Sequence, residues 1–246
     1  MRQTVAIVQA RMSSTRLPGK VLMEVAGRPA IWHLMDRLAQ ARSLDVVVLA
    51  IPNGPADDPL TRLAAAEGWT CFRGSEQDVL DRYYRAACRV GIGHGDAVVR
   101  ATGDDIMIDP RLVDVVVDLF WAAQPGVHHA SNNRVPSFPY GADVEVCSFQ
   151  ALEEAWKEAN QPEDREHVTP FIRSNPVRYP FVEVRCSEDR SWLRLSIDEA
   201  ADLEFNRQVF AQLYRPGYPA FSWQDVVRAV ERGEVPFEAR GRCATE

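Results

Sequence analysis

A cationic loop near the start of the chain has residue types that could hold an anion. The stretch VQARMSSTRLPGK, residues 8–20, directly follows an apolar run. It carries three cations, two serines and a glycine: Arg11, Ser13, Ser14, Arg16, Gly19 and Lys20. Positive charge beside hydroxyl and backbone donors is typical of anion-binding concavities. The pattern predicts a phosphate cradle, with a surface loop of scattered arginines as the alternative.

The spacing of this loop excludes the two common glycine-rich phosphate motifs. Lys20 is followed by Val21, and no glycine stands five residues before Gly19, so the P-loop pattern is absent. The stretch GIGHG, residues 91–95, precedes an expected strand, whereas a dinucleotide motif follows one. Lys20 is one of only two lysines beside 26 arginines. Its compact ammonium suits a single contact with phosphate.

Carboxylates follow another expected strand, in RATGDDIMIDP, residues 100–110. Asp104 and Asp105 supply hard oxygen ligands, and beside a polyphosphate site such ligands favour Mg²⁺. Asp109, directly before Pro110, is expected to cap a helix.

Asp198, in LRLSIDEAADLE, is a third carboxylate at a predicted strand end. The pattern favours a helix N-cap for it, and a metal ligand is the alternative.

Two further segments are polar without a clear structural need. Arg73 and Ser75, in FRGSEQDVLDRY, could touch a ligand, whereas Asp78 of the same segment could cap a helix. The segment EDREHVTPFIR, residues 163–173, clusters charge that could bind a ligand or simply cover a helix start. Its His167 has no Cys or His neighbour at ligand spacing, so a zinc role is not expected.

Alternating strands and helices must position these residues. Short apolar runs at 4–8, 45–50 and 96–101 predict buried strands, and apolar periodicity predicts helices at 29–41, 57–68, 78–91 and about 110–123. The alternation predicts an α/β fold with a doubly wound, mostly parallel sheet. Ligands bind beyond the carboxyl ends of such strands, so the cationic loop and Asp104 should share one rim.

The pattern changes in the second half of the chain. We expect a single domain over residues 1–246, with residues 130–190 as an insertion or subdomain. The chain should return to the main sheet with a strand at 192–198 and close with two helices, and residues from Phe237 on should be loosely held.

Composition narrows the class of protein. A net charge of −7 disfavours a general nucleic-acid or anionic-membrane surface. The chain has no apolar run of 18 residues and no signal-peptide pattern, which favours a cytoplasmic protein. Five irregularly spaced cysteines are interpreted as small buried hydrophobes.

Six segments together resemble a known family. VQARMSSTRLPGKVL is similar to the opening signature of the CMP-sugar synthetases, a cytidylyltransferase family. RGSEQDVLDRY, TGDDIMIDP, YGADVEVCSFQAL, REHVTPFIR and LRLSIDEAADLE resemble successive blocks of its spore-coat polysaccharide biosynthesis protein F branch. The resemblance spans residues 3 to about 205. It implies a nucleotide-diphospho-sugar transferase fold (GT-A-like, Rossmann-like), CTP, Mg²⁺ and a homodimer.

The resemblance also implies roles for individual residues. The catalytic residues would be Arg11, Lys20 and Asp104. The nucleotide would contact Ala10, Arg11, Ser13, Ser14, Arg16, Lys20, Arg73, Ser75 and Thr102. The acceptor would contact Asp143, Arg165, His167 and Arg173, within an insertion at 130–190 that serves acceptor binding or dimerisation. The metal ligands would be Asp104 and Asp198.

One departure from the family concerns the acceptor side. Relatives often have glutamine where Thr102 stands, and GDEP where this chain has GDDI. The departure bears on the acceptor and on a second metal position rather than on the nucleotide.

The implied reaction is transfer of CMP from CTP to an acidic sugar or a phosphonate, with release of pyrophosphate, in surface polysaccharide biosynthesis. Two other functions stay open at this stage. A glycosyltransferase of the same fold would need to hold only a diphosphate, whereas Arg11, Arg16 and Lys20 suit a triphosphate. A non-catalytic nucleotide-binding subunit is the other.

Overall fold

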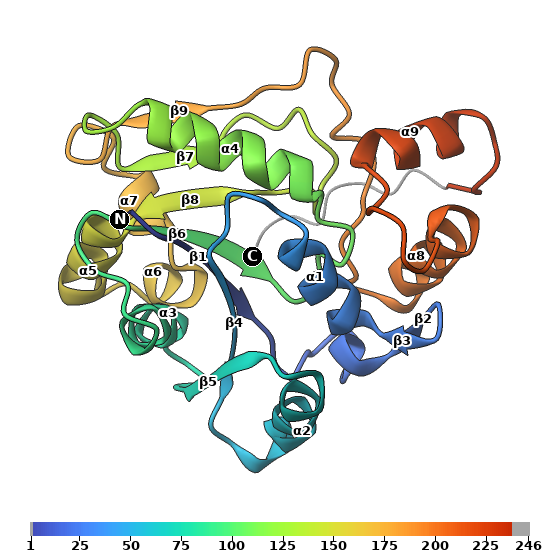
Figure 1. Cartoon of the computed structure of the whole chain (residues 1–246), viewed down its shortest axis with the longest axis horizontal. Coiled ribbons are helices and arrows are strands. Elements are labelled where there is room, and N and C mark those ends of the chain that lie inside the picture. The colour runs from blue at the N-terminus through green and yellow to red at the C-terminus, as the bar shows by residue number, and fades with distance from the viewer. Residues whose placement is uncertain (1, 238–246) are drawn as a thin grey trace.

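The protein is built on one mixed seven-stranded sheet, seen in a computed structural model that describes residues 2–237 (Figure 1). The strand order is β5-β4-β1-β6-β8-β7-β9, and β8 alone runs against its neighbours. The strands are β1 (Thr4–Gln9), β4 (Val46–Pro52), β5 (Thr70–Gly74), β6 (Ala97–Thr102), β7 (His129–Ser131), β8 (Glu145–Ser148) and β9 (Phe181–Glu183). The predicted α/β class with a mostly parallel sheet is confirmed.

Helices cover both faces of the sheet. They are α1 (Ala30–Ala39), α2 (Asp58–Glu67), α3 (Val79–Arg89), α4 (Pro110–Ala122), α5 (Phe149–Glu158), α6 (Pro162–His167), α7 (Pro170–Arg173), α8 (Ala200–Leu213) and α9 (Trp223–Glu231). One buried cluster lies between the sheet and α1, α4, α8 and α9, and the other lies between the sheet and α3 and α5. The central strands are long apolar runs because both of their faces are buried.

Short elements connect this framework. Two 3₁₀ turns, η1 (Lys20–Leu22) and η2 (Pro55–Asp57), follow β1 and β4. A small ribbon of β2 (Glu24–Val25) and β3 (Arg28–Pro29) lies beside α8, at the right of Figure 1. The expected caps are confirmed, since Asp78 accepts from the Asp81 backbone N–H and Asp109 from that of Arg111.

The second half of the chain differs from expectation. Residues 130–190 are not a separate subdomain, because β8 and β9 and most of β7 fall within them and belong to the main sheet. The strand expected at 192–198 does not form. That segment makes only one isolated bridge, between Tyr140 and Arg194, and otherwise runs as a loop. Leu193, Leu195 and Ile197 are buried without a neighbouring strand, which the alternating pattern alone could not reveal.

Two smaller expectations also need correction. Cys147 is buried and Cys71 and Cys186 are partly buried, but Cys88 is exposed on α3. Phe237 packs its ring edge-on against Trp192, so the chain is held as far as this residue. The rest of the expected loose end, residues 238–246, and Cys243 lie outside the described residues.

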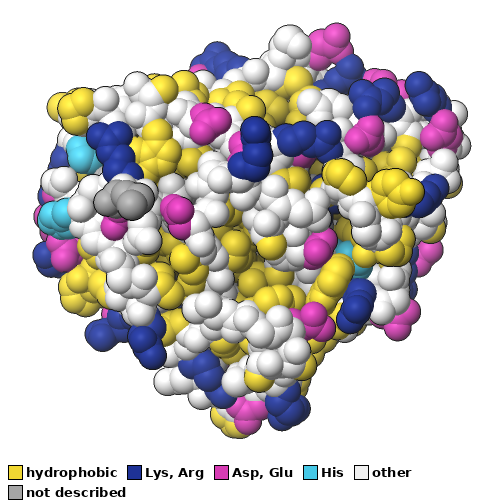
Figure 2. All heavy atoms as spheres, in the orientation of Figure 1, with side chains coloured by type: hydrophobic (Ala, Val, Ile, Leu, Met, Phe, Trp, Pro, Cys, Tyr) yellow, Lys and Arg dark blue, Asp and Glu magenta, His cyan; other side chains and the backbone are white. Residues whose placement is uncertain are grey.

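Within residues 2–237, no helix is long and apolar enough to cross a membrane. On the face shown in Figure 2, basic and acidic side chains are interspersed with hydrophobic ones. The net negative charge therefore does not gather into one patch on that face.

Candidate active site

The cationic loop is fixed in place by its own backbone. Gly19 adopts a left-handed conformation (φ 72°), and its N–H donates to the Met12 carbonyl at 3.0 Å. The Met12 N–H in turn donates to Asp57 Oδ1 at 2.8 Å, which ties the loop to η2. A glycine suits this turn because a side chain would be strained at positive φ. The turn starts η1 and directs Lys20 toward the sheet edge.

A second glycine brings Asp104 to the same place. The Gly103 N–H donates to the Gln9 carbonyl at 2.8 Å, so the loop after β6 lies directly against the end of β1. A Cβ at Gly103 would meet that carbonyl at 2.9 Å and the Ala10 Cβ at 3.0 Å. Only glycine allows this approach. The shared rim predicted for the cationic loop and Asp104 is therefore formed.

Three oxygen atoms converge on the Lys20 ammonium. Its Nζ donates to Asp104 Oδ2 at 2.8 Å, to the Ile197 carbonyl at 2.6 Å and to Asp198 Oδ1 at 3.1 Å. The Lys20 side chain is only 11% exposed. Burial alone would lower the pKa of Lys20, but the two carboxylates raise it above its ordinary value. Lys20 therefore stands as a fully engaged cation between two carboxylates.

Asp198 does not cap the helix that follows it, contrary to the pattern-based interpretation. Glu199 is the N-cap of α8, and Asp202 completes the capping box. The Asp198 carboxylate instead pairs with Lys20, with Arg194 and, at 2.9 Å, with Arg16. It is thus available to the site rather than to the helix.

The loops that carry the two carboxylates are also joined through their backbones. The Ile197 N–H donates to the Asp104 carbonyl at 3.0 Å. Segments 93 residues apart in the chain therefore meet edge to edge at the end of the sheet.

The donor set at this point fits a divalent cation. Mg²⁺ is commonly held by one or two carboxylates together with substrate phosphates. Asp104 and Asp198 offer two carboxylates that already share one cationic neighbour, Lys20. Within residues 2–237, no cluster of three or more acidic, His or Cys side chains could hold a metal on its own. Any ion here would therefore complete its coordination with oxygens of water or of a bound ligand.

A cavity of about 270 Å³ opens at this rim. Its lining includes all three predicted cations and both carboxylates: Arg11, Arg16, Lys20, Asp104 and Asp198. It also includes the predicted nucleotide residues Ala10, Ser14 and Thr102.

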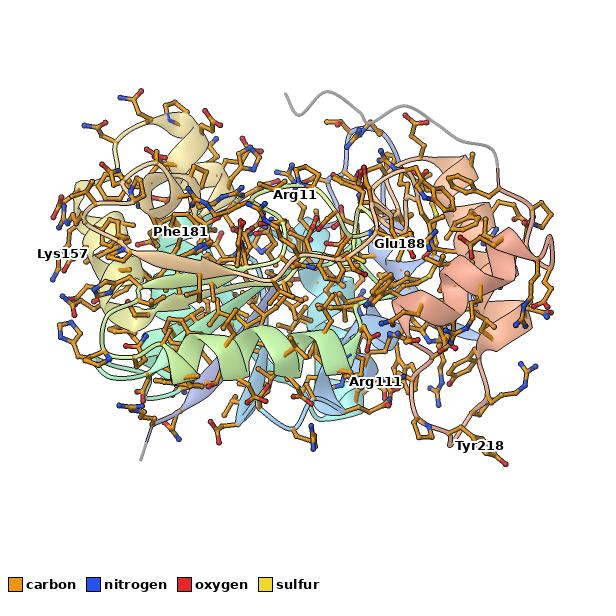
Figure 3. All side chains as sticks on the ribbon, turned by 90° about the horizontal axis from the view of Figure 1, so that it is seen from above. Arg11, Arg111, Lys157, Phe181, Glu188 and Tyr218 are labelled. Carbon is orange, nitrogen blue, oxygen red and sulfur yellow. The ribbon has the colours of Figure 1, made fainter. Side chains whose placement is uncertain are left out.

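Arg11 has no acidic partner among residues 2–237. In Figure 3 it lies near the middle of the view, between the helices of residues 149–173 and the C-terminal helices.

Arg82, on α3, is a further cation of this cavity that the sequence reasoning missed. Its side chain is 2% exposed, and its Nε is buried without a hydrogen-bond partner among the described residues. Its other end donates to the Ser75 carbonyl. Burial, with a smaller contribution from Arg11, lowers the pKa of Arg82. An arginine on the buried face of an amphipathic helix was the available signal.

Asp105, next to Asp104, points away from the cavity into the protein. It is 9% exposed and accepts a hydrogen bond from the Thr102 hydroxyl. Burial, followed by the charges of Asp104 and Asp143, raises the pKa of Asp105 well above its ordinary range. The two neighbouring carboxylates thus have different environments, and only Asp104 faces Lys20.

Three predicted nucleotide residues lie outside the lining of this cavity. The Arg73 guanidinium is held by Asp58 at 2.7 Å and by the Gly54 carbonyl at 2.7 Å. The Ser75 hydroxyl accepts from the Asp78 N–H at 3.0 Å, within the start of α3. Ser13 is exposed and donates to Glu76 at 2.7 Å. Each of these side chains has a protein partner in this structure.

A second cavity, of about 790 Å³, adjoins the first. The two share His167, which lines both. The second cavity is lined by Arg100, Asn133, Arg134, Tyr140, Glu145, Glu163, Asp164, His167, Thr169, Pro170, Arg173 and Ser174. Of the predicted acceptor residues, His167 and Arg173 are therefore brought together here.

A buried ionic network forms the floor of the second cavity. Glu145 Oε1 pairs with Arg100 at 3.0 Å, and Oε2 accepts from the Thr169 hydroxyl at 2.8 Å. His129 and Arg173 lie 3.5 and 3.6 Å from Oε2. Burial alone would raise the pKa of Glu145, but His129, Arg100 and Arg173 hold it below its ordinary range. Sequence reasoning missed this charged pair inside two strands.

The other two predicted acceptor residues lie outside both linings. Arg165 is clamped by Asp78, with its Nε 3.0 Å from Oδ1, and by the Trp156 carbonyl at 2.7 Å. It ties α6 to the start of α3. Asp143 precedes β8, and burial together with Glu145 raises the pKa of Asp143 to about 6.

Comparison with solved structures defines the class of protein. A cytidylyltransferase from Leptospira borgpetersenii superposes with a TM-score of 0.88 at 29% identity, covering 95% of this chain and 96% of that chain. A CMP:2-keto-3-deoxy-manno-octonic acid synthetase complexed with CTP superposes with a TM-score of 0.63 at 19% identity, covering 85% and 99%. The fold is thus one that cytidylyltransferases adopt.

Sequence comparison identifies the family. The sequence model described as Cytidylyltransferase matches residues 5–216, and this chain belongs to that family. The chain is 35% identical over 202 residues to the uncharacterized protein MJ1063 of Methanocaldococcus jannaschii, covering 81% of this chain and 80% of the relative. It is 32% identical over 211 residues to the spore coat polysaccharide biosynthesis protein SpsF of Bacillus subtilis, covering 83% and 85%. The resemblance noted from the sequence is confirmed.

Proposed function

We propose that this cytidylyltransferase transfers CMP from CTP to an acidic sugar or a phosphonate and releases pyrophosphate. The observation that carries the proposal is the meeting of Lys20, Asp104 and Asp198 at one end of a cavity that also holds Arg11 and Arg16. Membership of the cytidylyltransferase family supports CTP as the donor.

The triphosphate is proposed to lie in the smaller cavity. Arg11 and Arg16 of the loop and Arg82 of α3 supply positive charge along its wall. Cations placed where charge develops on the departing pyrophosphate stabilise the transition state more than the ground state. Asp104 and Asp198 are the residues that would hold Mg²⁺. When bound, Mg²⁺ supplies charge neutralisation on the phosphates.

The acceptor is proposed to lie in the larger cavity. Arg173 is 33% exposed there and can approach a carboxylate or phosphonate, for which the planar arginine fork is well suited. Glu145 lines the same cavity and lies 3.6 Å from the Arg173 guanidinium, which it helps to orient. His167 stands where the two cavities meet, so an acceptor oxygen beside it would face the α-phosphorus. Positioning of this kind carries most phosphoryl-type catalysis.

Release of pyrophosphate tests the proposal. We expect one nucleoside triphosphate, CTP, to give pyrophosphate with Mg²⁺ and an acceptor drawn from a panel of acidic sugars and phosphonates. A glycosyltransferase would instead turn over a sugar nucleotide without pyrophosphate, and that outcome would overturn the proposal. The family match and the number of cations at the rim favour the cytidylyltransferase.

The biological setting is proposed from relatives. The match to SpsF over more than four-fifths of both chains supports a role in surface polysaccharide biosynthesis. A homodimer is proposed on family resemblance, and sedimentation velocity would test it.

A further inference from the structure

The Lys20 ammonium occupies the point between the two carboxylates that are proposed to hold the metal. It approaches Asp104 Oδ2 at 2.8 Å, Asp198 Oδ1 at 3.1 Å and the Ile197 carbonyl at 2.6 Å. An ammonium has three donors, and all three are used here. Lys20 therefore cannot contact a triphosphate in this arrangement, although its place in the cationic loop suggests that it should.

We propose that Lys20 is an internal cation that occupies the metal position until a divalent ion displaces it. The inference rests on the proposed use of Asp104 and Asp198 as metal ligands. Displacement frees the ammonium to turn toward the triphosphate, so entry of the metal and engagement of Lys20 with phosphate become one linked change.

Charge and burial explain why an internal cation is needed. The Asp198 side chain is 6% exposed and that of Asp104 is 25% exposed. Two carboxylates this close repel each other in a medium of low dielectric constant unless a cation lies between them. Arg16 and Arg194 also reach Asp198, and among residues 2–237 the Lys20 ammonium pairs with both carboxylates. Removing it leaves Asp104 without its ion-pair partner.

The loop around Lys20 allows such a movement. Lys20 begins η1, one residue after the left-handed Gly19, and its side chain is long and unbranched. The backbone anchors of the loop, at Met12 and Gly19, do not involve the ammonium. The side chain can therefore leave the carboxylates while the loop keeps its shape.

Metal binding without nucleotide tests the inference directly. We expect the Lys20→Met variant to bind Mn²⁺ at least about tenfold more tightly than the unsubstituted protein, by paramagnetic resonance of free Mn²⁺, since a competing cation is gone. The chain has one other lysine, Lys157, whose ammonium pairs with Glu153 at 3.0 Å on α5. Figure 3 places it at the far left end of the molecule. Lys157→Met should bind Mn²⁺ like the unsubstituted protein.

Two further variants locate the effect. Adding Asp104→Asn to Lys20→Met should abolish the gain in Mn²⁺ affinity. Lys20→Gln should show the same gain as Lys20→Met, which keeps the test valid if the methionine variant does not fold. Equal Mn²⁺ affinity in the lysine variants and the unsubstituted protein would overturn the inference.

A second measurement uses the unsubstituted protein. Trace acetic anhydride labels free amines, and Lys157 serves as an internal reference for Lys20. At constant ionic strength, Mn²⁺ at about 10 mM should occupy a pair of carboxylates. It should therefore raise the labelling of Lys20 relative to Lys157 severalfold. An unchanged ratio would contradict displacement. Neither measurement contains nucleotide or acceptor, so failure here is distinct from failure to release pyrophosphate.

Discussion

The two cavities differ in how their charges are used. In the smaller cavity, the loop after β1 supplies Arg11, which has no acidic partner among residues 2–237, while Lys20 and Arg16 pair with Asp198. In the larger cavity, Arg100 and Arg173 both lie beside one buried carboxylate, Glu145, at 3.0 and 3.6 Å. The first arrangement suits a highly charged ligand such as a triphosphate. The arrangement in the larger cavity suits a ligand that is recognised by hydrogen bonds as well as by charge.

The largest expected effect is the loss of turnover when Asp104, which lines the smaller cavity, is substituted. Asp104→Asn should lower turnover by at least about 1000-fold while CTP still binds, because the oxygen that would hold the metal loses its charge. Initial rates of pyrophosphate release check this. Asp118→Asn, on the exposed face of α4, is the matched control and should keep full activity. An active Asp104→Asn protein would favour a non-catalytic role.

On the other side of the comparison, Glu145→Gln should mainly lower stability. The partly buried Arg100 would lose its charged partner, at a cost of about 3 kcal/mol in the free energy of unfolding. Urea unfolding measures the loss. A loss below about 1 kcal/mol in the free energy of unfolding would mean that the ion pair contributes no more than a solvated surface pair.

Lys20→Ala should reduce turnover by about 100-fold, since an ammonium is lost beside the departing pyrophosphate. Lys20→Arg should restore activity only in part, because a planar guanidinium cannot occupy the same point. Steady-state rates with saturating CTP test both variants. Full turnover by Lys20→Ala would refute the triphosphate assignment.

Substitutions of two arginines, one in each cavity, should affect the KM values of different substrates. Arg11→Ala should raise the KM for CTP about tenfold and leave the KM for the acceptor unchanged. Arg173→Ala should do the reverse. Initial-rate measurements with each substrate varied in turn would reveal the split. Equal effects on both KM values would mean that the cavities do not bind separate substrates.

The smallest expected effect concerns pH and Asp143. Its pKa is raised by burial to about 6 from an ordinary 3.8, so folding favours its protonated form. The folded protein therefore binds more protons than the unfolded chain between these values, and stability from this group falls as pH rises from about 4 to about 6. Asp143→Asn should gain about 1 kcal/mol at pH 8 and little at pH 4, by thermal unfolding. An equal gain at both pH values would contradict the assignment.

The same comparison explains what could be predicted from the sequence. The smaller cavity is built from contiguous motifs at strand ends, so the meeting of Arg11, Lys20 and Asp104 followed from the parallel topology. The larger cavity is built from single residues on separate elements. Glu145 and Arg100 meet because β8 runs antiparallel to β6, and the reversal of one strand was not visible in the pattern.

Some roles could not be assigned from the sequence because a local pattern has several uses. Arg165 and Arg73 lie in polar segments and pair in the structure with nearby aspartates, Asp78 and Asp58, so their contacts with a ligand stay predictions. Asp198 looked like a helix cap because it precedes α8, yet the next residue, Glu199, does the capping. Three-dimensional neighbours decide between such uses, and a single sequence does not name them.

The fate of two labels in CTP tests the central claim most directly. With Mg²⁺ and a productive acceptor, label at the α-phosphorus should appear in the acceptor product and label at the γ-phosphorus should appear in pyrophosphate. The Asp104→Asn protein should move neither label. Transfer of the γ-label to the acceptor, or turnover of a sugar nucleotide with no pyrophosphate, would contradict the account.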